Sequence, residues 1–459
     1  MTYRFNNYKY LILLLYGLFA ILMSAAVSQD MLMILNFAIF GSVIAYLLLK
    51  QEKLLLALTI AVSIFNEGIP FVNGTYLVFF LYGLMCFSLL VNKEKNKIHY
   101  GFLAVVLVSF VLTLIPSIVN GTSIPLLLIA TLKRYGFVIV FIYALNLLPL
   151  QGKFRKKIDL LFIALLLVNF LAAFLQYLGG NRTQDFITGF LGDGTTGIYI
   201  YLFMFYLAVA SGLHYQKKIS TPVYAALALV PLVYSAVAEV KIGFVTTAII
   251  LLIYLVFFKR GYVSFILLIG GGFALTWLYS VFASIYPEHN FLSMNFLETY
   301  LVEDAYGGGD TLNRFGFKPA VDALVFSNSQ NDILFGKGLG SGNPSETEFL
   351  KGDVYRNFDY LKYSWFTMPY LYIEAGLAGT VSFLMIYILP FLLSIREFIR
   401  RKSSLALVLV LMGLTNLIYL PYNSGLFSYG ITTVYWFYLA MLIQEKDKST
   451  ESLNPETSD

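Results

Sequence analysis

Long apolar blocks separated by short polar connectors fill most of this chain. Fourteen apolar stretches are present, and most approach the roughly 20 residues that a helix needs to cross the hydrocarbon core. Because lipid cannot satisfy the open edge of a strand, we expect each stretch to be a helix. Several stretches are short or interrupted, so twelve or thirteen spans also fit the pattern. The predicted spans are residues 8–27, 31–49, 54–71, 75–92, 101–119, 125–148, 159–179, 197–215, 221–238, 242–258, 261–282, 366–395, 403–421 and 425–444.

One long polar segment, residues 283–365, interrupts this pattern late in the chain. The pattern therefore predicts an all-α integral membrane protein, a polytopic helix bundle of about 14 (12–14) transmembrane helices with one large extracytoplasmic loop. About 11 spans fall in residues 1–282, the loop is 283–365, and about three more spans fall in 366–444. The polar tail 445–459 is predicted to be cytoplasmic and disordered.

Composition supports the membrane class. Hydrophobic residues make up 59% of the chain and charged residues only 12%, whereas soluble globular domains carry about 25% charged residues. The single cysteine, Cys86, lies inside a predicted span, so the chain has no disulfide framework and no cysteine-based metal cluster. We expect neither a metal nor a cofactor.

Basic residues cluster in alternate connectors, which sets the predicted orientation. Because basic loops stay on the cytoplasmic side, both termini are expected inside the cell and the long loop outside. These cytoplasmic clusters account for the net charge of +5, so the charge requires no nucleic-acid partner. The clusters are Arg4/Lys9, Lys50/Lys53, Lys93/Lys95/Lys97, Lys153/Arg155/Lys156/Lys157, Lys217/Lys218, Lys259/Arg260, Arg396/Arg400/Arg401/Lys402 and Lys446/Lys448.

Two adjacent cations, Lys133 and Arg134, lie in the middle of the apolar run 124–148. A cation near the bilayer centre costs about 2.5–3.5 kcal/mol on insertion scales, so two in succession need a partner or a water-filled cavity. One interpretation is functional, because charge inside a membrane generally marks a substrate or ion site. The alternative is that one side chain reaches the interface and the other pairs with a buried acid.

Glu239 and Lys241 lie in the short connector Ala238–Gly243 between two predicted spans. A turn this short places both side chains at the outer interface. They either form an interfacial pair that ends a hairpin, or they supply a phosphate-binding lysine beside a carboxylate.

A second outer segment, residues 179–197, is rich in glycine and contains Arg182 and Asp193. It leads directly into a predicted span, and the backbone amides at a helix start favour anions. A glycine-rich segment is equally typical of an ordinary turn.

The long loop contains two glycine-rich stretches, residues 307–316 with Arg314 and residues 333–342 with Lys337. Neither is a P-loop, because no Gly-Lys-Ser/Thr closes the motif. Between them a helix is expected to begin at Pro319, since proline suits the first helical position. The loop also carries many Tyr and Trp residues, which suit either sugar rings or the membrane interface.

In this order the features resemble the superfamily of O-antigen ligases and O-antigen or capsule polymerases. Four segments are similar to family motifs: the Arg- and Gly-rich outer turn 182–197, the turn 235–243, the Asn-Arg and Gly-x-Gly-x-Gly stretches at 312–314 and 335–340, and the return to the membrane at 364–376. Members have a histidine where the chain returns to the membrane. Here residues 363–365 are Tyr-Ser-Trp, which favours a polymerase over a ligase.

The resemblance implies a metal-independent membrane glycosyltransferase of cell-envelope biosynthesis, making O-antigen, capsule or another exopolysaccharide. It would join undecaprenyl-pyrophosphate-linked oligosaccharide repeat units at the outer face of the bacterial cytoplasmic membrane, with a chain-length regulator protein as a further partner. The alternatives are a ligase-type glycan transferase and a lipid-linked oligosaccharide flippase or other transporter. The implied pyrophosphate-binding residues are Arg182, Lys241, Arg314, Lys133, Arg134 and Lys337, and the implied catalytic carboxylates are Glu239, Asp193 and Glu374.

Overall fold

The computed structural model describes most of the chain after residue 48. The described residues are 49–68, 74–91, 99–147, 153–180, 186–255, 269–273, 276–277, 280, 284, 311–345 and 347–451. Every regular element within these ranges is helical, which agrees with the predicted all-α class. The predicted spans 8–27 and 31–49, most of span 261–282 and loop residues 285–310 lie outside the described residues.

Five described helices are long and apolar enough to cross a membrane. A sixth candidate is a pair of shorter helices that meet at a bend of 53°. Together with the exposed apolar faces described below, these helices indicate a membrane protein. The count of fourteen spans stays a prediction. The five are α4 (Gly74–Val91), α5 (Tyr100–Val119), α8 (Lys153–Leu178), α9 (Thr196–Tyr215) and α17 (Thr367–Arg401), and the bent pair is α6 (Ile124–Tyr135) with α7 (Phe137–Asn146).

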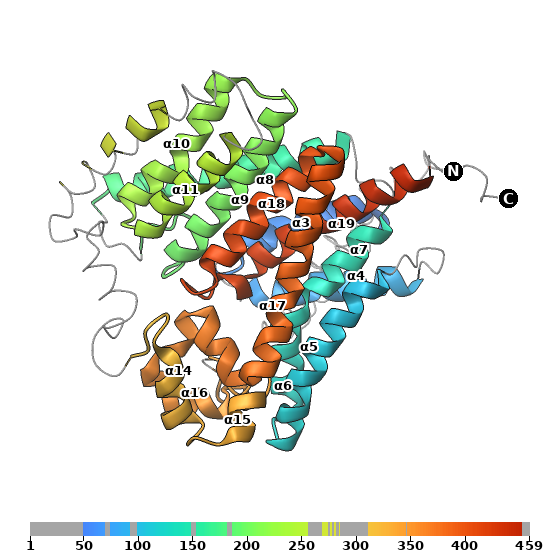
Figure 1. The fold of residues 1–459 in the computed structure, drawn as a ribbon, viewed down its shortest axis with the longest axis vertical. Helices are drawn as coiled ribbons and strands as arrows, with labels where there is room; N and C mark the ends of the chain where they lie inside the picture. The colour runs from blue at the N-terminus through green and yellow to red at the C-terminus, as the bar shows by residue number, and fades with distance from the viewer. Residues whose placement is uncertain are drawn as a thin grey trace, which may run out of the picture.

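Five further helices complete the bundle (Figure 1). They are α3 (Glu52–Phe65), α10 (Thr221–Val237), α11 (Lys241–Ile253), α18 (Ser404–Tyr419) and α19 (Tyr429–Glu451).

Most of the described helices of the bundle start within a few residues of a predicted span. Two predictions were wrong. The predicted span 125–148 is broken at Gly136, and the helix predicted over 54–71 ends at Phe65, where the turn-forming residues Asn66, Glu67 and Gly68 begin.

The bundle is organised around α9, which is buried along almost its whole length. It packs against α8, α10, α11 and α18, and α19 packs against α3 and α7. The outer helices instead expose rows of apolar side chains, for example Leu107 and Ile115 on α5 and Leu171 and Leu175 on α8. Continuous apolar faces of this kind suit contact with lipid rather than water.

Residues 311–365 form a compact unit of short helices, here called the loop unit. It lies beside α5, α6 and the start of α17 and is orange in Figure 1. It contains α14 (Phe317–Ala320), a π-helical turn (Val321–Val325), α15 (Gln330–Phe335) and α16 (Asp353–Phe358). The helix expected from Pro319 begins two residues earlier, at Phe317. The unit has its own small core, which includes Leu312, Val321, Phe326, Leu361 and Tyr372.

A break in α17 joins this unit to the bundle. Gly376 adopts φ 59° and ψ −165°, a conformation that is essentially restricted to glycine. Just before the break, the carbonyl oxygens of Ile373 and Glu374 accept hydrogen bonds from the backbone N–H groups of Lys337 and Gly338, each at 2.8 Å. The glycine-rich stretch of the loop is therefore bonded directly to the broken helix.

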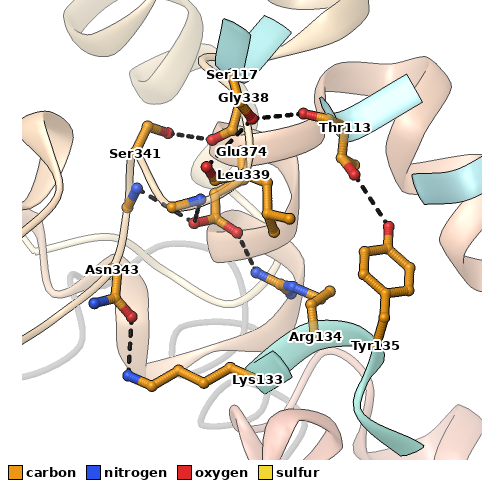
Figure 2. Close-up of polar contacts among 12 residues, drawn as sticks. Thr113, Ser117, Lys133, Arg134, Tyr135, Gly338, Leu339, Ser341, Asn343 and Glu374 are labelled. Carbon is orange, nitrogen blue, oxygen red and sulfur yellow. Dashed lines mark hydrogen bonds and ion pairs between the residues drawn. The ribbon is translucent and has the colours of Figure 1, made fainter. Parts of the chain in front are cut away.

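The same stretch also contacts α5. The N–H of Leu339 donates to the Thr113 carbonyl at 3.2 Å, and the Ser117 hydroxyl donates to the Leu339 carbonyl at 3.2 Å (Figure 2). A Cβ on Gly338 would lie only 2.4 Å from backbone atoms of Ser117, so only glycine fits this approach. The stretch is thus inserted between α5 and α17.

Candidate functional site

The two adjacent cations of the apolar run 124–148 lie at the bend between α6 and α7. Lys133 and Arg134 occupy the last turn of α6, which ends at Tyr135, directly before Gly136. A Cβ on Gly136 would lie 2.7 Å from the ring of Tyr82, which explains why a small residue occupies the bend. Because α7 continues in a different direction, the end of α6 and its two basic side chains face the loop unit (Figure 2).

Arg134 is paired with Glu374 of α17. The two side chains form an ion pair and hydrogen bond, and they are only 5% and 2% exposed. The guanidinium carbon also lies 3.7 Å from the ring centroid of Phe427 and 4.9 Å from that of Tyr370, within cation–π range. Arg134 therefore pairs with a buried acid, which is the second of the two interpretations offered by the sequence.

Glu374 is also held by the glycine-rich loop stretch. Its Oε1 accepts hydrogen bonds from the backbone N–H groups of Gly340, at 2.9 Å, and Gly342, at 3.3 Å. Both carboxylate oxygens of Glu374 are thus occupied by partners within the protein, so the geometry assigns it an anchoring role and argues against the predicted role as catalytic base.

Lys133 is oriented by the loop unit. Its Nζ donates to Oδ1 of Asn343 at 2.9 Å, and Asn343 is held in turn because its Nδ2 donates to the Leu350 carbonyl at 2.7 Å. Unlike Arg134, Lys133 is only partly buried. A loop residue therefore positions a cation that stays accessible from the adjoining cavity.

That cavity has a volume of about 210 Å³ and lies where the loop unit meets the ends of several helices. Four charged residues contribute to its wall: Glu67, Lys133, Arg134 and Glu374. The rest of the wall is mainly polar and aromatic with three aliphatic residues, and it has contributions from α4, α6, α9, α17, α19 and the loop unit. These other lining residues are Asn66, Thr75, Ala130, Ile198, Asn343, Pro344, Ser364, Tyr370, Ser424, Phe427, Ser428 and Tyr429.

A second cavity, of about 340 Å³, adjoins the first, because Ile198 and Ser424 line both. Its charged residues are Glu239 and Arg314. Arg314 is 3% exposed, and its Nε donates to the Tyr422 carbonyl at 3.3 Å. Two neighbouring cavities that each contain a cation and a carboxylate are therefore the main feature of this face of the bundle.

The predicted turn between α10 and α11 is confirmed. Glu239 takes a left-handed conformation with φ 56°, and the N–H of Val240 donates to the Ser235 carbonyl at 3.0 Å, as in a Schellman helix end. Lys241 then begins α11, and its charge interacts with those of Glu239 and Arg314. The structure thus brings Arg314 of the loop unit close to Glu239 and Lys241, although it is far from both in the sequence.

Three other predicted site residues are not part of this group. Arg182 lies outside the described residues. Asp193 is exposed and lines neither cavity. Lys337 also lines neither cavity, and its Nζ pairs with Asp332 at 2.6 Å. The backbone N–H of Lys337, rather than its side chain, joins the loop unit to α17 by donating to the Ile373 carbonyl.

The sequence did not single out Glu67, Asn343 or Tyr370, although all three line the first cavity. Glu67 was placed inside the predicted span 54–71. The signal that could have found it is the tripeptide Asn66-Glu67-Gly68, because these residue types commonly end an apolar helix in a turn. Within the described ranges, no group of three His, Cys, Asp or Glu side chains is arranged to hold a metal ion.

No protein-family model matches the chain, and no curated protein matches its sequence. The two cavities and the residues that line them are therefore the features from which a function can be inferred.

Proposed function

We propose that this protein is a membrane polysaccharide polymerase that joins lipid-pyrophosphate-linked oligosaccharide repeat units at the outer face of the bacterial cytoplasmic membrane. The observation that carries the proposal is the pair of adjoining cavities, one with Lys133 and Arg134 and the other with Arg314. Transfer between two lipid-linked substrates requires the pyrophosphate of the donor and the terminal sugar of the acceptor to lie side by side. The resemblance to the O-antigen and capsule polymerases supports the same reaction.

This reaction depends more on positive charge at the leaving group than on a strong nucleophile. A lipid pyrophosphate is the leaving group, and preorganised positive charges stabilise the negative charge that develops on it. Arginine supplies several donors in a planar fork, and lysine supplies a compact point charge. We assign this role to Lys133 and Arg314, which line the cavities, and to Lys241, whose charge interacts with that of Arg314. Arg134 holds the wall of the first cavity through Glu374.

The distribution of charge supports an outward orientation of the cavities. Asn66 and Glu67 follow the end of α3 and line the first cavity, whereas Lys50 and Lys53 flank its beginning. At that opposite end of the bundle, Lys50, Lys53 and Lys157 line a wide recess. Since basic residues favour the cytoplasmic side, the cavities would face outward.

The proposal is tested in cells that lack this gene and in the same cells after the gene is restored. The expected result is that single lipid-linked repeat units accumulate outside in the deletion strain, and that a ladder of long chains returns on complementation. Repeat units trapped inside the cell would indicate a flippase instead. Full-length polymer left on its lipid carrier would indicate a ligase.

In that complemented strain, Arg314→Ala should lower chain extension by roughly 10- to 100-fold, the loss of about 1.5–3 kcal/mol of charged hydrogen bonding. The matched control is Lys318→Ala in the same loop unit, since Lys318 is exposed, lines neither cavity, and contacts Asp322 one turn away and the ring of Tyr372. The readout is polymer length on gels at equal protein abundance in the membrane. Normal polymer from Arg314→Ala would remove Arg314 from the mechanism.

Lys241→Arg should retain partial chain extension, because the cation beside Glu239 and Arg314 is kept. Lys241→Ala should lose most of it. The two variants are compared by the same gel assay, with membrane abundance as the control. Equal activity in both would reduce Lys241 to a residue that only anchors the start of α11.

A further inference from the structure

Glu67 occupies a turn whose backbone is tightly fixed. The N–H of Gly68 donates to the Phe65 carbonyl at 3.0 Å, which closes the turn after α3. A Cβ on Gly68 would lie 1.7 Å from the Phe190 carbonyl oxygen, and a Cβ on Gly192 would lie 2.8 Å from the Glu67 carbonyl oxygen. The turn is therefore packed directly against the backbone of the segment 190–192, with no room for side chains between them.

The Glu67 side chain is not engaged in the same way. It lines the first cavity, is solvent-accessible, and makes no hydrogen bond or ion pair with any of the residues that the structure describes. Glu374, the other carboxylate in this cavity, is in contrast occupied by Arg134 and two backbone amides. Of the two carboxylates, Glu67 is the one whose oxygens are available to a bound molecule.

The charges that face Glu67 come mainly from α6. Loss of contact with water raises the pKa of Glu67 above its ordinary value, and the charge of Lys133, which lines the same cavity, lowers it by a smaller amount. Arg134 and Glu374 lie in the same wall and neutralise each other. The phenols of Tyr370, on α17, and Tyr429, on α19, are further titratable groups in the wall. A carboxylate with a raised pKa is a stronger base than an ordinary glutamate.

We infer that Glu67 is the general base of the reaction and that the first cavity holds the acceptor sugar hydroxyl between Glu67 and Lys133. This inference rests on the proposed function and names a catalytic residue for it. The acceptor O–H proton moves to the Glu67 carboxylate as the oxygen forms a bond to the anomeric carbon of the donor. The bond from that carbon to the pyrophosphate oxygen breaks, and the electron pair leaves with the lipid pyrophosphate anion. Protonated Glu67 then returns its proton to solvent through the open cavity.

The test uses the full-length protein in proteoliposomes supplied with the lipid-linked repeat units that accumulate in the deletion strain. Glu67→Gln should lower chain extension by about 10²–10⁴-fold, the contribution of a general base. Glu67→Asp should recover part of the activity, because it keeps the carboxylate on a shorter side chain. The control is Glu348→Gln, an exposed loop carboxylate paired with Lys351, which should leave the rate unchanged.

The pH profile separates a base from a residue that only positions others. Wild-type activity should fall as the pH drops through the raised pKa of Glu67, since only the ionised carboxylate accepts the proton. The residual activity of Glu67→Gln should lack this fall. Wild-type rates in Glu67→Gln, or an unchanged acid limb in its residual activity, would overturn the inference while leaving the polymerase in place. If the wild-type protein forms no polymer, the proposed function and this inference both fail.

Discussion

Glu374→Ala will destabilise the protein by about 3–5 kcal/mol, because it leaves the buried guanidinium of Arg134 without its counter-charge. The backbone amides of Gly340 and Gly342 lose their acceptor in the same step. We expect a lower unfolding temperature in detergent and a lower abundance in the membrane. A change of less than about 1 kcal/mol, the value typical of an exposed pair, would contradict the anchoring role.

A double variant separates this structural effect from a catalytic one. Arg134→Met with Glu374→Met removes both charges, and apolar replacement of a whole buried ion pair is often neutral or stabilising. We expect the double variant to regain much of the stability lost in Glu374→Ala. It should also retain measurable chain extension, since Glu67 and Lys133 remain in the cavity. Restored stability without any activity would return Glu374 or Arg134 to the catalytic group.

Gly376→Ala is expected to have the second large effect, because it acts on the break in α17. A Cβ there would lie 2.4 Å from backbone atoms of Leu334 and Phe335, and alanine is strained at φ 59° and ψ −165°. Backbone strain and overpacking each cost about 1–3 kcal/mol, so the loss should be roughly 2–6 kcal/mol. The loop unit should separate from α17 and become sensitive to protease added outside the cell.

Gly83→Ala is the matched control for this substitution. Gly83 lies in α4 in open space, with no atom within 4 Å of the position that a Cβ would occupy and no positive φ. Alanine is the better helix former by about 0.5–1 kcal/mol, so the control should be neutral or slightly stabilising. If Gly376→Ala behaves like Gly83→Ala in protease sensitivity and unfolding temperature, the break does not hold the loop unit.

The helices could be predicted because each is a continuous apolar block whose ends are marked by polar residues. The bend at Gly136 could not, since the run 125–148 stays apolar on both sides of it and a single glycine inside such a run does not by itself mark a bend. Glu67 was placed inside an expected span because apolar residues continue at 69–71, beyond the turn signal Asn66-Glu67-Gly68.

The candidate site was predicted only in part, for a physical reason. Two adjacent intramembrane cations require compensation, so Lys133 and Arg134 could be singled out from the sequence alone. Their partners, Glu374 and Asn343, are more than 200 residues away and become visible only when the loop unit is docked. For the glycine-rich stretch 333–342, the resemblance implied pyrophosphate binding by Lys337. Two backbone amides of this stretch do bind an anion, but that anion is the carboxylate of the protein's own Glu374.

We propose that the protein joins lipid-linked repeat units to one another at its two cavities. The most direct measurement places the purified protein in liposomes with the repeat units extracted from the deletion strain, and follows product length on gels over time. We expect a ladder of lipid-linked chains that lengthens over time with the wild-type protein and is nearly absent with Arg314→Ala. Repeat units that cross the bilayer while remaining single would contradict it and make the protein a transporter.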